Sequence, residues 1–193
     1  MRMLIAIAAT SCAAEMSLPD RVARGEVRGP VEVIGEPGAN VLVAPMQRGR
    51  VWIAPGGSPI VFELVSNGHP IGVVAELSHG TVTAMRVYAD STQGHPISRT
   101  PFAGTAIATA HGTAAEAALV ATANESWAGM NAHSAARTLA SAAPEYTLED
   151  FSAPTVLDRA GTEAMVDRFL GFVGEFQIVA MPVQFAAGDD VIT

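Results

Sequence analysis

The sequence contains no lysine, because all 11 basic residues among its 193 are arginine. Without lysine the chain can form neither a Schiff base nor the lysine contact of a P-loop. Acidic residues number 19, so the formal net charge is −8. This balance argues against a general nucleic-acid binder, which needs a basic surplus to displace counterions from phosphates.

Cysteine is nearly absent, since Cys12 is the only one. The chain therefore forms no intrachain disulfide and no cysteine zinc site. The histidines lack the spacing of a metal motif, and no glycine-rich phosphate loop or nucleophile elbow occurs. We expect no metal and no cofactor. The five histidines are His69, His79, His95, His111 and His133.

Long apolar runs are also missing: beyond the first residues no stretch of 18 apolar residues occurs, so we expect no membrane span. The N-terminus itself has a charged start, an apolar run over residues 3–9 and then Cys12, as in a lipoprotein signal. The alternative is an alanine-rich helix packed on a core. We expect the helix and a cytoplasmic protein, with a secreted or lipid-anchored form as the alternative.

Apolar residues make up 49% of the chain and charged residues only 16%, which is enough to form a packed core. Between residues 27 and 90 short apolar runs alternate with turn signals, among them Asn67-Gly68, a hairpin signal. The last run is apolar on both faces, so it should lie inside the sheet. The runs predict strands at 31–34, 41–44, 50–53, 60–65, 71–77 and 81–90.

Arg86 lies inside the last of these strands, where a buried guanidinium requires a carboxylate partner. Glu76 and Asp150 are the two candidates. If Asp150 is the partner, its pKa falls and it becomes a poor base.

After a linker over 91–111, or alternatively a structured crossover, the pattern becomes helical. Thr113 and Glu116 form a capping box, and Ser134 caps a second helix. Thr162 is expected to open a third helix. The core-facing residues of this third helix would be Met165, Val166, Phe169, Leu170 and Val173. The other elements expected in this half are a first helix that ends near Gly129, strands at 145–150 and 176–183, a turn at 188–190 and a strand from 191.

The chain thus divides into a strand-rich half over 1–92, with the N-terminal helix plus a sheet, a linker over 93–112, and a helix-rich half over 113–193. Neither half should stand alone, because the helical stripe needs a sheet to cover it and the sheet needs a covering layer.

Three stretches resemble a known family: Trp127 to Pro154, which includes the phrase from Tyr146 to Phe151, then Gly161 to Met165, and the hairpin from Phe62 through Asn67-Gly68 to Asp90. They are similar to the nuclear-transport-factor-2-like superfamily, in its ketosteroid-isomerase and SnoaL-like polyketide-cyclase branches. The resemblance implies an α+β fold, with a cone-shaped, curved, mixed or antiparallel sheet wrapped around three helices. The family places its helices first and its sheet last, and this chain has the reverse order. We therefore expect a circularly permuted cone or a domain-swapped homodimer.

The resemblance also implies a proton-transferring carboxylate at Asp150, assisted by Asp90 at the cone mouth or by the Tyr146 hydroxyl. The alternatives are a surface Asp150, a turn-capping Asp90 and a tyrosine packed at the rim. Ser126 and Trp127 stand where that branch places an enolate-stabilising tyrosine. True ketosteroid isomerisation is therefore not expected.

The hollow of such a cone would be lined by apolar and aromatic residues, which are alternatively ordinary core: Trp127, Phe62, Met85, Tyr88 and Phe169. The predicted function is a SnoaL-like protein with an apolar pocket for a small hydrophobic or polycyclic ligand. As an enzyme it would perform cofactor-free isomerisation, cyclisation or epoxide opening. The alternative is a non-catalytic ligand-binding or dimerisation domain.

Overall fold

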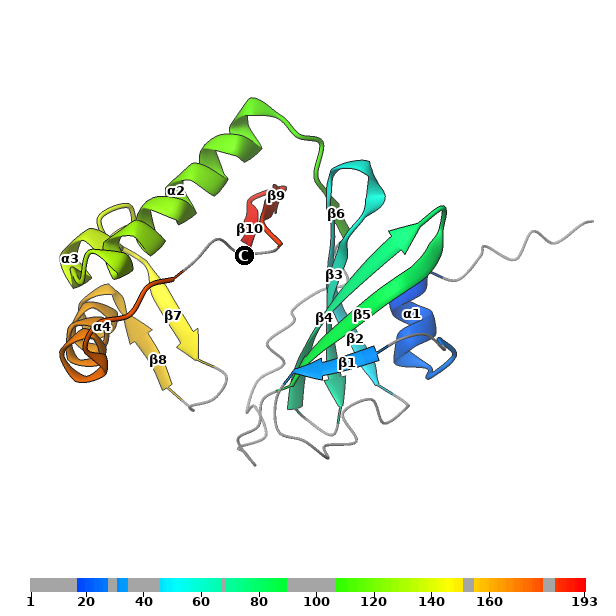
Figure 1. The fold of residues 1–193 in the computed structure, drawn as a ribbon, viewed down its shortest axis with the longest axis horizontal. Helices are drawn as coiled ribbons and strands as arrows, with labels where there is room; N and C mark the ends of the chain where they lie inside the picture. Colours follow the sequence, from blue (N-terminus) through cyan, green and yellow to red (C-terminus); the bar gives the residue numbers. More distant parts are fainter. Residues whose placement is uncertain are drawn as a thin grey trace, which may run out of the picture.

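The structure, a computed structural model, describes residues 17–27, 31–34, 46–66, 69–89, 107–150, 155–178 and 183–193. Over these residues the chain is α+β, as predicted. A six-stranded sheet forms one lobe and a group of helices forms the other (Figure 1). The predicted N-terminal helix and the strand at 41–44 lie outside the described residues.

The sheet lobe contains a short helix and a mixed, mostly antiparallel sheet in the order β1-β5-β4-β3-β2-β6. Only the pairs β1–β5 and β2–β6 are parallel among the described strands. The elements are α1 (Leu18–Ala23), β1 (Val31–Ile34), β2 (Gln47–Ile53), a 3-10 turn (Pro55–Gly57), β3 (Ile60–Ser66), β4 (His69–Ser78), β5 (Thr81–Ala89) and β6 (Ile107–Thr109).

Most of the strand predictions in this lobe are confirmed. β5 lies inside the sheet between β1 and β4, as its two apolar faces indicate. The turn between β4 and β5 is a two-residue loop in which His79 and Gly80 both have positive φ, 50° and 77°. Such a turn matches the twist of the strands that it joins. The turn at Asn67-Gly68 lies outside the described residues.

Two elements of this lobe differ from the prediction. Residues 107–109, expected in the linker, form β6 beside β2. A strand of three residues forms because it pairs with a strand that is distant in the sequence, and its own residues give little indication of strand structure. The second is α1, which was not predicted. It packs Val22 and Ala23 on the sheet, and the Asp20 carboxylate lies 2.7 Å from Arg48 Nε.

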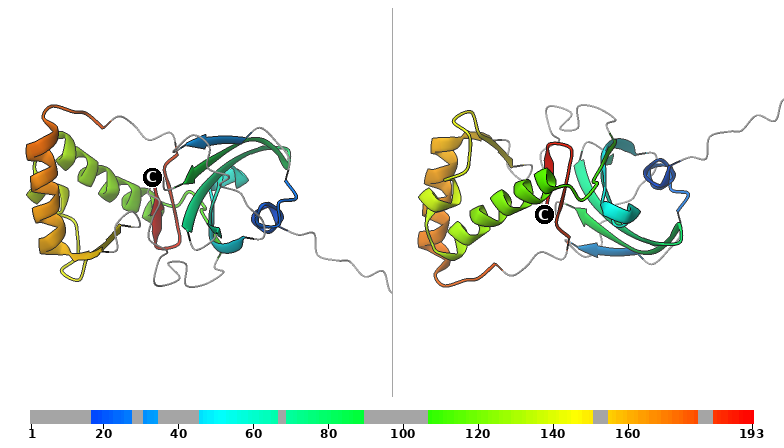
Figure 2. Two further views of the ribbon diagram at one scale, coloured as in Figure 1. Left: turned by 90° about the horizontal axis from the view of Figure 1, so that it is seen from below. Right: turned by 90° about the horizontal axis from the view of Figure 1, so that it is seen from above.

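The helical lobe begins with the long α2 (Ala114–Asn131), which Figure 2 shows running between the lobes. It continues through α3 (Ala135–Thr138), the antiparallel pair β7 (Thr147–Asp150) and β8 (Thr155–Asp158), and α4 (Arg159–Val173). The C-terminal hairpin, β9 (Phe185–Ala187) and β10 (Asp190–Ile192), lies between the two lobes in both views of Figure 2.

The predicted caps of α2 and α3 are confirmed. The Glu116 amide donates to Thr113 Oγ1 at 3.2 Å, and the Glu116 carboxylate accepts from the Thr113 amide at 2.7 Å. Ser134 Oγ accepts from the Arg137 amide at the start of α3. These contacts satisfy amides that a helix start leaves without partners.

The third helix does not begin at Thr162, because Asp158 is its N-cap and Arg159 its first residue. Asp158 Oδ1 accepts from the Gly161 amide at 2.7 Å, and Thr162, buried within the first turn, donates its hydroxyl to the Asp158 carbonyl. Residues 176–178 have no strand conformation, contrary to the prediction for 176–183, of which 179–182 lie outside the described residues. Among the described residues, no helix is long and apolar enough to cross a bilayer.

Candidate functional site

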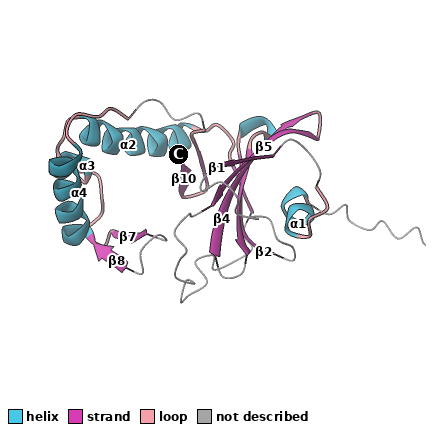
Figure 3. Cartoon of the chain, turned by 60° about the horizontal axis from the view of Figure 1, so that its bottom comes forward, coloured by secondary structure: helices cyan, strands magenta, loops and turns pink. Residues whose placement is uncertain are grey.

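The residues predicted to line a pocket are placed on both lobes. Phe62 and Met85 lie together in the sheet core, fully buried beneath α1. Tyr88 is 41% exposed on β5, opposite Gly72 of β4. Trp127 lies half-buried on α2, and Phe169 is 45% exposed on α4. Figure 3 shows the sheet strands and α4 at opposite ends of the molecule, with α2 extending from the α4 end toward the C-terminal hairpin.

The residues predicted to be catalytic are only partly described. Tyr146 lies half-buried immediately before β7. The backbone of Asp150 ends β7, with Thr155 as its Cα partner, while its side chain is outside the described residues. Asp90 lies outside them altogether. The catalytic role of this set stays a prediction.

Arg86 has the carboxylate partner that its place in a strand requires. Its Nη1 donates to Glu76 Oε1 at 3.0 Å, and its Nε lies 3.5 Å from Glu32 Oε2 on the adjacent β1. Of the two candidates from sequence, Glu76 is therefore the observed partner.

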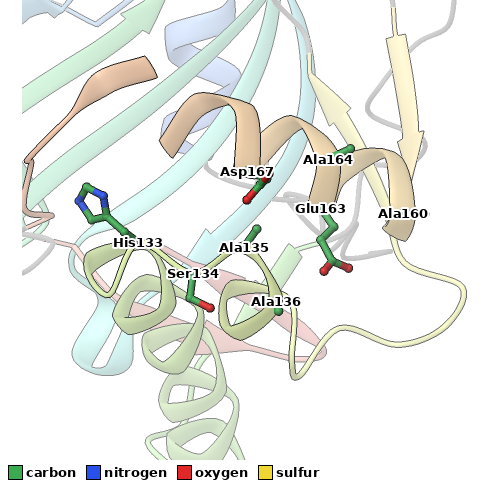
Figure 4. Close-up of a pocket in the computed structure, with 8 residues that line it drawn as sticks. All are labelled: His133, Ser134, Ala135, Ala136, Ala160, Glu163, Ala164 and Asp167. Atoms are coloured by element: carbon green, nitrogen blue, oxygen red, sulfur yellow. The ribbon is translucent and has the colours of Figure 1, made fainter. Parts of the chain in front are cut away.

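The helical lobe has an open groove of about 590 Å³ between the start of α3 and one face of α4. Figure 4 shows Glu163 and Asp167 on the α4 side and His133 and Ser134 on the α3 side. Alanines complete the lining: Ala135, Ala136, Ala160 and Ala164. Among the described residues, none of the predicted pocket or catalytic residues lines this groove, whose lining is about half polar and half apolar.

A close helix crossing holds this lobe together. A Cβ at Gly129 of α2 would lie 2.3 Å from the Thr138 backbone nitrogen. Glycine alone permits that approach, because no rotamer can move a Cβ away from a backbone atom. Arg159 Nη2 donates to the Leu139 carbonyl at 3.0 Å, which joins the start of α4 to the end of α3. Together the two contacts place α2 against α3 and the start of α4 against the end of α3.

The apolar arc of α4 is wider than the part that the lobe buries. Thr162, Val166 and Leu170, four residues apart, form the buried row. Met165, Phe169 and Val173 form the adjacent row and were predicted to be core, but they are 36%, 45% and 37% exposed. Phe172 is 89% exposed. We call the four exposed residues, Met165, Phe169, Phe172 and Val173, the α4 apolar face.

Sequence reasoning identified the α4 periodicity but not which part of it is covered. Among the described residues of this lobe, Ala135, Val166 and Leu170 form the buried cluster, with Met130 and Phe176 packed against it. Phe176 contacts Phe169 edge to face at 5.8 Å between ring centres. The sequence did contain one indication that part of the arc is uncovered, which is its width. Phe172 makes the apolar arc of α4 wider than the surface that one neighbouring helix covers.

A second cluster, missed from sequence, joins the C-terminal hairpin to the sheet. We call Arg50, Trp52, Glu63 and Asp190 the Arg50 cluster. Trp52 Nε1 donates to Asp190 Oδ2 at 2.8 Å, and Arg50 donates to both carboxylate oxygens of Glu63 at 3.3 Å. The Arg50 guanidinium lies 4.9 Å from the centre of the Trp52 ring and 3.8 Å from Asp190.

A β-bulge makes this cluster possible. The register of β2 and β3 shifts between Arg48 and Val51, so two residues of β2 lie opposite Glu63 alone. This brings the Arg50 amide within 3.2 Å of Glu63 Oε2. Burial raises the pKa of Glu63, and the bonds from Arg50 partly oppose that rise. Apolar contacts surround the cluster, with Phe185 and Ala187 of the hairpin packed on Trp52 and Ala54.

Comparisons of this chain with protein-family models, with curated proteins and with solved structures return no match.

Proposed function

We propose that this chain is a binding and assembly domain of the nuclear-transport-factor-2-like type, the non-catalytic alternative that the sequence left open. The observation that carries the proposal is the α4 apolar face, on which Phe172 is 89% exposed. Within the helical half alone, the order α2, α3, a short strand pair, α4 and then a hairpin agrees with the helices-before-sheet order that the resemblance implies, although the chain as a whole has the sheet first.

The exposed apolar area is large for one helix. Burying a phenylalanine contributes about 1.5–3 kcal/mol relative to leaving it in water. Isolated apolar residues on a surface are normal, but a contiguous apolar patch is typical of an interaction site. Met165, Phe169 and Phe172 are contiguous because residues three, four and seven apart share a helix face. The α4 apolar face is therefore suited to bind an apolar surface.

The described residues favour binding over catalysis. Phe62 and Met85, expected in a ligand pocket, fill the sheet core instead. An acid–base enzyme would need a partly buried carboxylate beside an apolar cavity. The groove beside α4 is open and holds charged as well as apolar side chains, so among the described residues it is not such an enclosed apolar cavity. The catalytic alternative predicts that Asp150→Asn lowers turnover of an enone or epoxide panel by orders of magnitude; our proposal predicts no turnover by the wild type.

The binding face can be tested with the apolar dye ANS. At low protein concentration we expect the folded wild-type chain to bind the dye, and the double variant Phe169→Ser/Phe172→Ser to lose most of its fluorescence. The matched control is Ala164→Ser, an exposed position on the groove side of the same helix. Circular dichroism verifies that all three chains are folded. Equal dye fluorescence from the double variant and the control would refute the proposal.

A further inference from the structure

We infer that the partner of the α4 apolar face is the same face on a second copy of this chain, in an antiparallel, two-fold symmetric pair. This inference rests on the proposed binding function and names its partner. Figures 1 and 3 place α4 at the end of the molecule opposite the sheet. A second copy can therefore approach α4 without meeting the sheet lobe.

The spacing of the α4 apolar face is self-complementary. In an antiparallel pair centred between Arg168 and Phe169, Met165 lies opposite Phe172 of the partner subunit, and the reverse contact follows by symmetry. Arg168 lies three residues after Met165 and four before Phe172, so it borders the same face. It then lies beside Phe169 of the partner subunit, where a guanidinium stacks favourably on an aromatic ring.

The charges on α4 leave the centre of this pairing free of carboxylates, despite the net charge of −8 on each copy. All residues of α4 are described, and its two carboxylates, Glu163 and Asp167, line the groove beside α3 instead. The charged residue that borders the apolar face is the exposed Arg168. The pairing thus brings no carboxylates together at its centre. It does place the two Arg168 guanidiniums near each other, a repulsion that the stacking of each on Phe169 of the partner subunit has to outweigh. Repulsion between the acidic copies acts at longer range, and added salt screens it.

The exposed area predicts a weak dimer. A fully exposed aromatic side chain presents about 150–250 Å². With exposures of 36%, 45%, 89% and 37%, the four residues present on the order of 400 Å² per copy. The pair would bury about 800 Å², below the roughly 1,200 Å² of standard stable interfaces. We therefore expect association at micromolar concentrations or above, and stronger association at 0.5 M than at 0.05 M salt.

Sedimentation velocity from micromolar to millimolar concentration tests the pair. The wild type should shift from monomer toward dimer, Phe172→Ser should need at least tenfold more protein for the same shift, and Ala164→Ser should match the wild type. Arg168→Glu should also weaken association, because it keeps a like-charged pair at the centre and removes the stacking on Phe169 of the partner subunit. A wild type that stays monomeric throughout, or a Phe172→Ser chain that dimerises like the control, overturns the inference.

Cross-linking tests the antiparallel register. In a Cys12→Ser background, Met165→Cys mixed with Phe172→Cys should form disulfide-linked dimers under oxidation. Each variant alone should not, because the same residue on the two copies lies about 10 Å apart along the axis at 1.5 Å per residue, and a disulfide needs Cα atoms within about 7 Å. Equal cross-linking of single variants and mixture would refute the register. A dimer in which a partner's sheet covers α4, as in a domain swap, would give no cross-link in the mixture.

The two proposals can fail separately. If the wild type binds ANS through Phe169 and Phe172 but never associates, the binding face stands and its partner is not a second copy. If the dye is insensitive to both residues, the proposed function itself fails.

Discussion

The two lobes of this chain are built with very different amounts of core. Within the described residues, the sheet lobe has a continuous cluster of 11 buried apolar residues, whereas the cluster of the helical lobe has three. The sheet lobe thus contains its own core. The helical lobe depends on helix caps, one close backbone crossing and polar links, and it leaves apolar surface in water. This difference indicates that the sheet lobe provides most of the stability, while the helical lobe leaves the α4 apolar face exposed.

The largest expected contrast is between two phenylalanines. Phe62 is fully buried in the sheet core, so Phe62→Ala should destabilise the chain by about 3–5 kcal/mol. Phe172→Ala should change the unfolding free energy by less than about 0.5 kcal/mol, because the side chain is already in water. Urea denaturation at low protein concentration measures both. Comparable losses would mean that α4 is covered in solution, contrary to the comparison.

The next effect concerns the helix crossing. Gly129→Ala places a Cβ against the Thr138 backbone, so we expect a loss of about 1–3 kcal/mol or more. Gly171→Ala on α4 is the matched control, since nothing lies within 4 Å of the added Cβ; it should stabilise by about 0.5–1 kcal/mol. Hydrogen exchange should locate the loss in α2, α3 and α4. A Gly129→Ala chain as stable as the Gly171→Ala control would show that the helices do not cross so closely.

A smaller effect is expected at the start of α4. Asp158→Ala removes the cap of the Gly161 amide and should cost about 1 kcal/mol. Because the helical lobe has little core, faster amide exchange should extend along α4 while β3 and β4 stay protected. Asp158→Asn retains an accepting oxygen and should restore most of the stability. Equal exchange in β3 and α4 would indicate that the two lobes unfold as one unit.

How far the sequence predicts this structure depends on the range of the interactions. Local signals sufficed for the strands around Phe62, for the capping box at Thr113 and for the need of Arg86 for a carboxylate, but not for the choice of Glu76 over Asp150. β6 was missed because only its pairing with β2, more than 50 residues earlier, makes it a strand. The α4 periodicity indicated an amphipathic helix, but periodicity does not say whether Phe169 or Val166 meets a neighbour.

The candidate sites show the same limit. The need of Arg86 for a carboxylate follows from its own strand, whereas the Arg50 cluster requires a bulge in β2 and a contact with Asp190 from the far end of the chain. Neither the bulge nor that contact leaves a local signal. A charged pair such as Arg50 and Glu63 within otherwise apolar strands was the available indication that two strands face each other.

The smallest predicted effect is the pH dependence of the Arg50 cluster, which joins the sheet to the hairpin. Burial raises the pKa of Glu63 in the folded state, with Arg50 opposing and Asp190 adding to the rise. The folded chain therefore takes up this proton at a higher pH than the unfolded chain does. The contribution of Glu63 to stability is greatest below its unfolded pKa and is lost as the pH rises through the folded pKa.

Comparing the wild type with Glu63→Gln isolates this contribution, because glutamine does not titrate. As the pH falls from 7 to 4, the unfolding free energy of the wild type should increase relative to that of Glu63→Gln, whatever their difference at pH 7. Chemical denaturation at several pH values measures the trend. A wild type that loses stability relative to Glu63→Gln on acidification would mean that the ion pair with Arg50 outweighs burial, and that the cluster joins the lobes chiefly through charge.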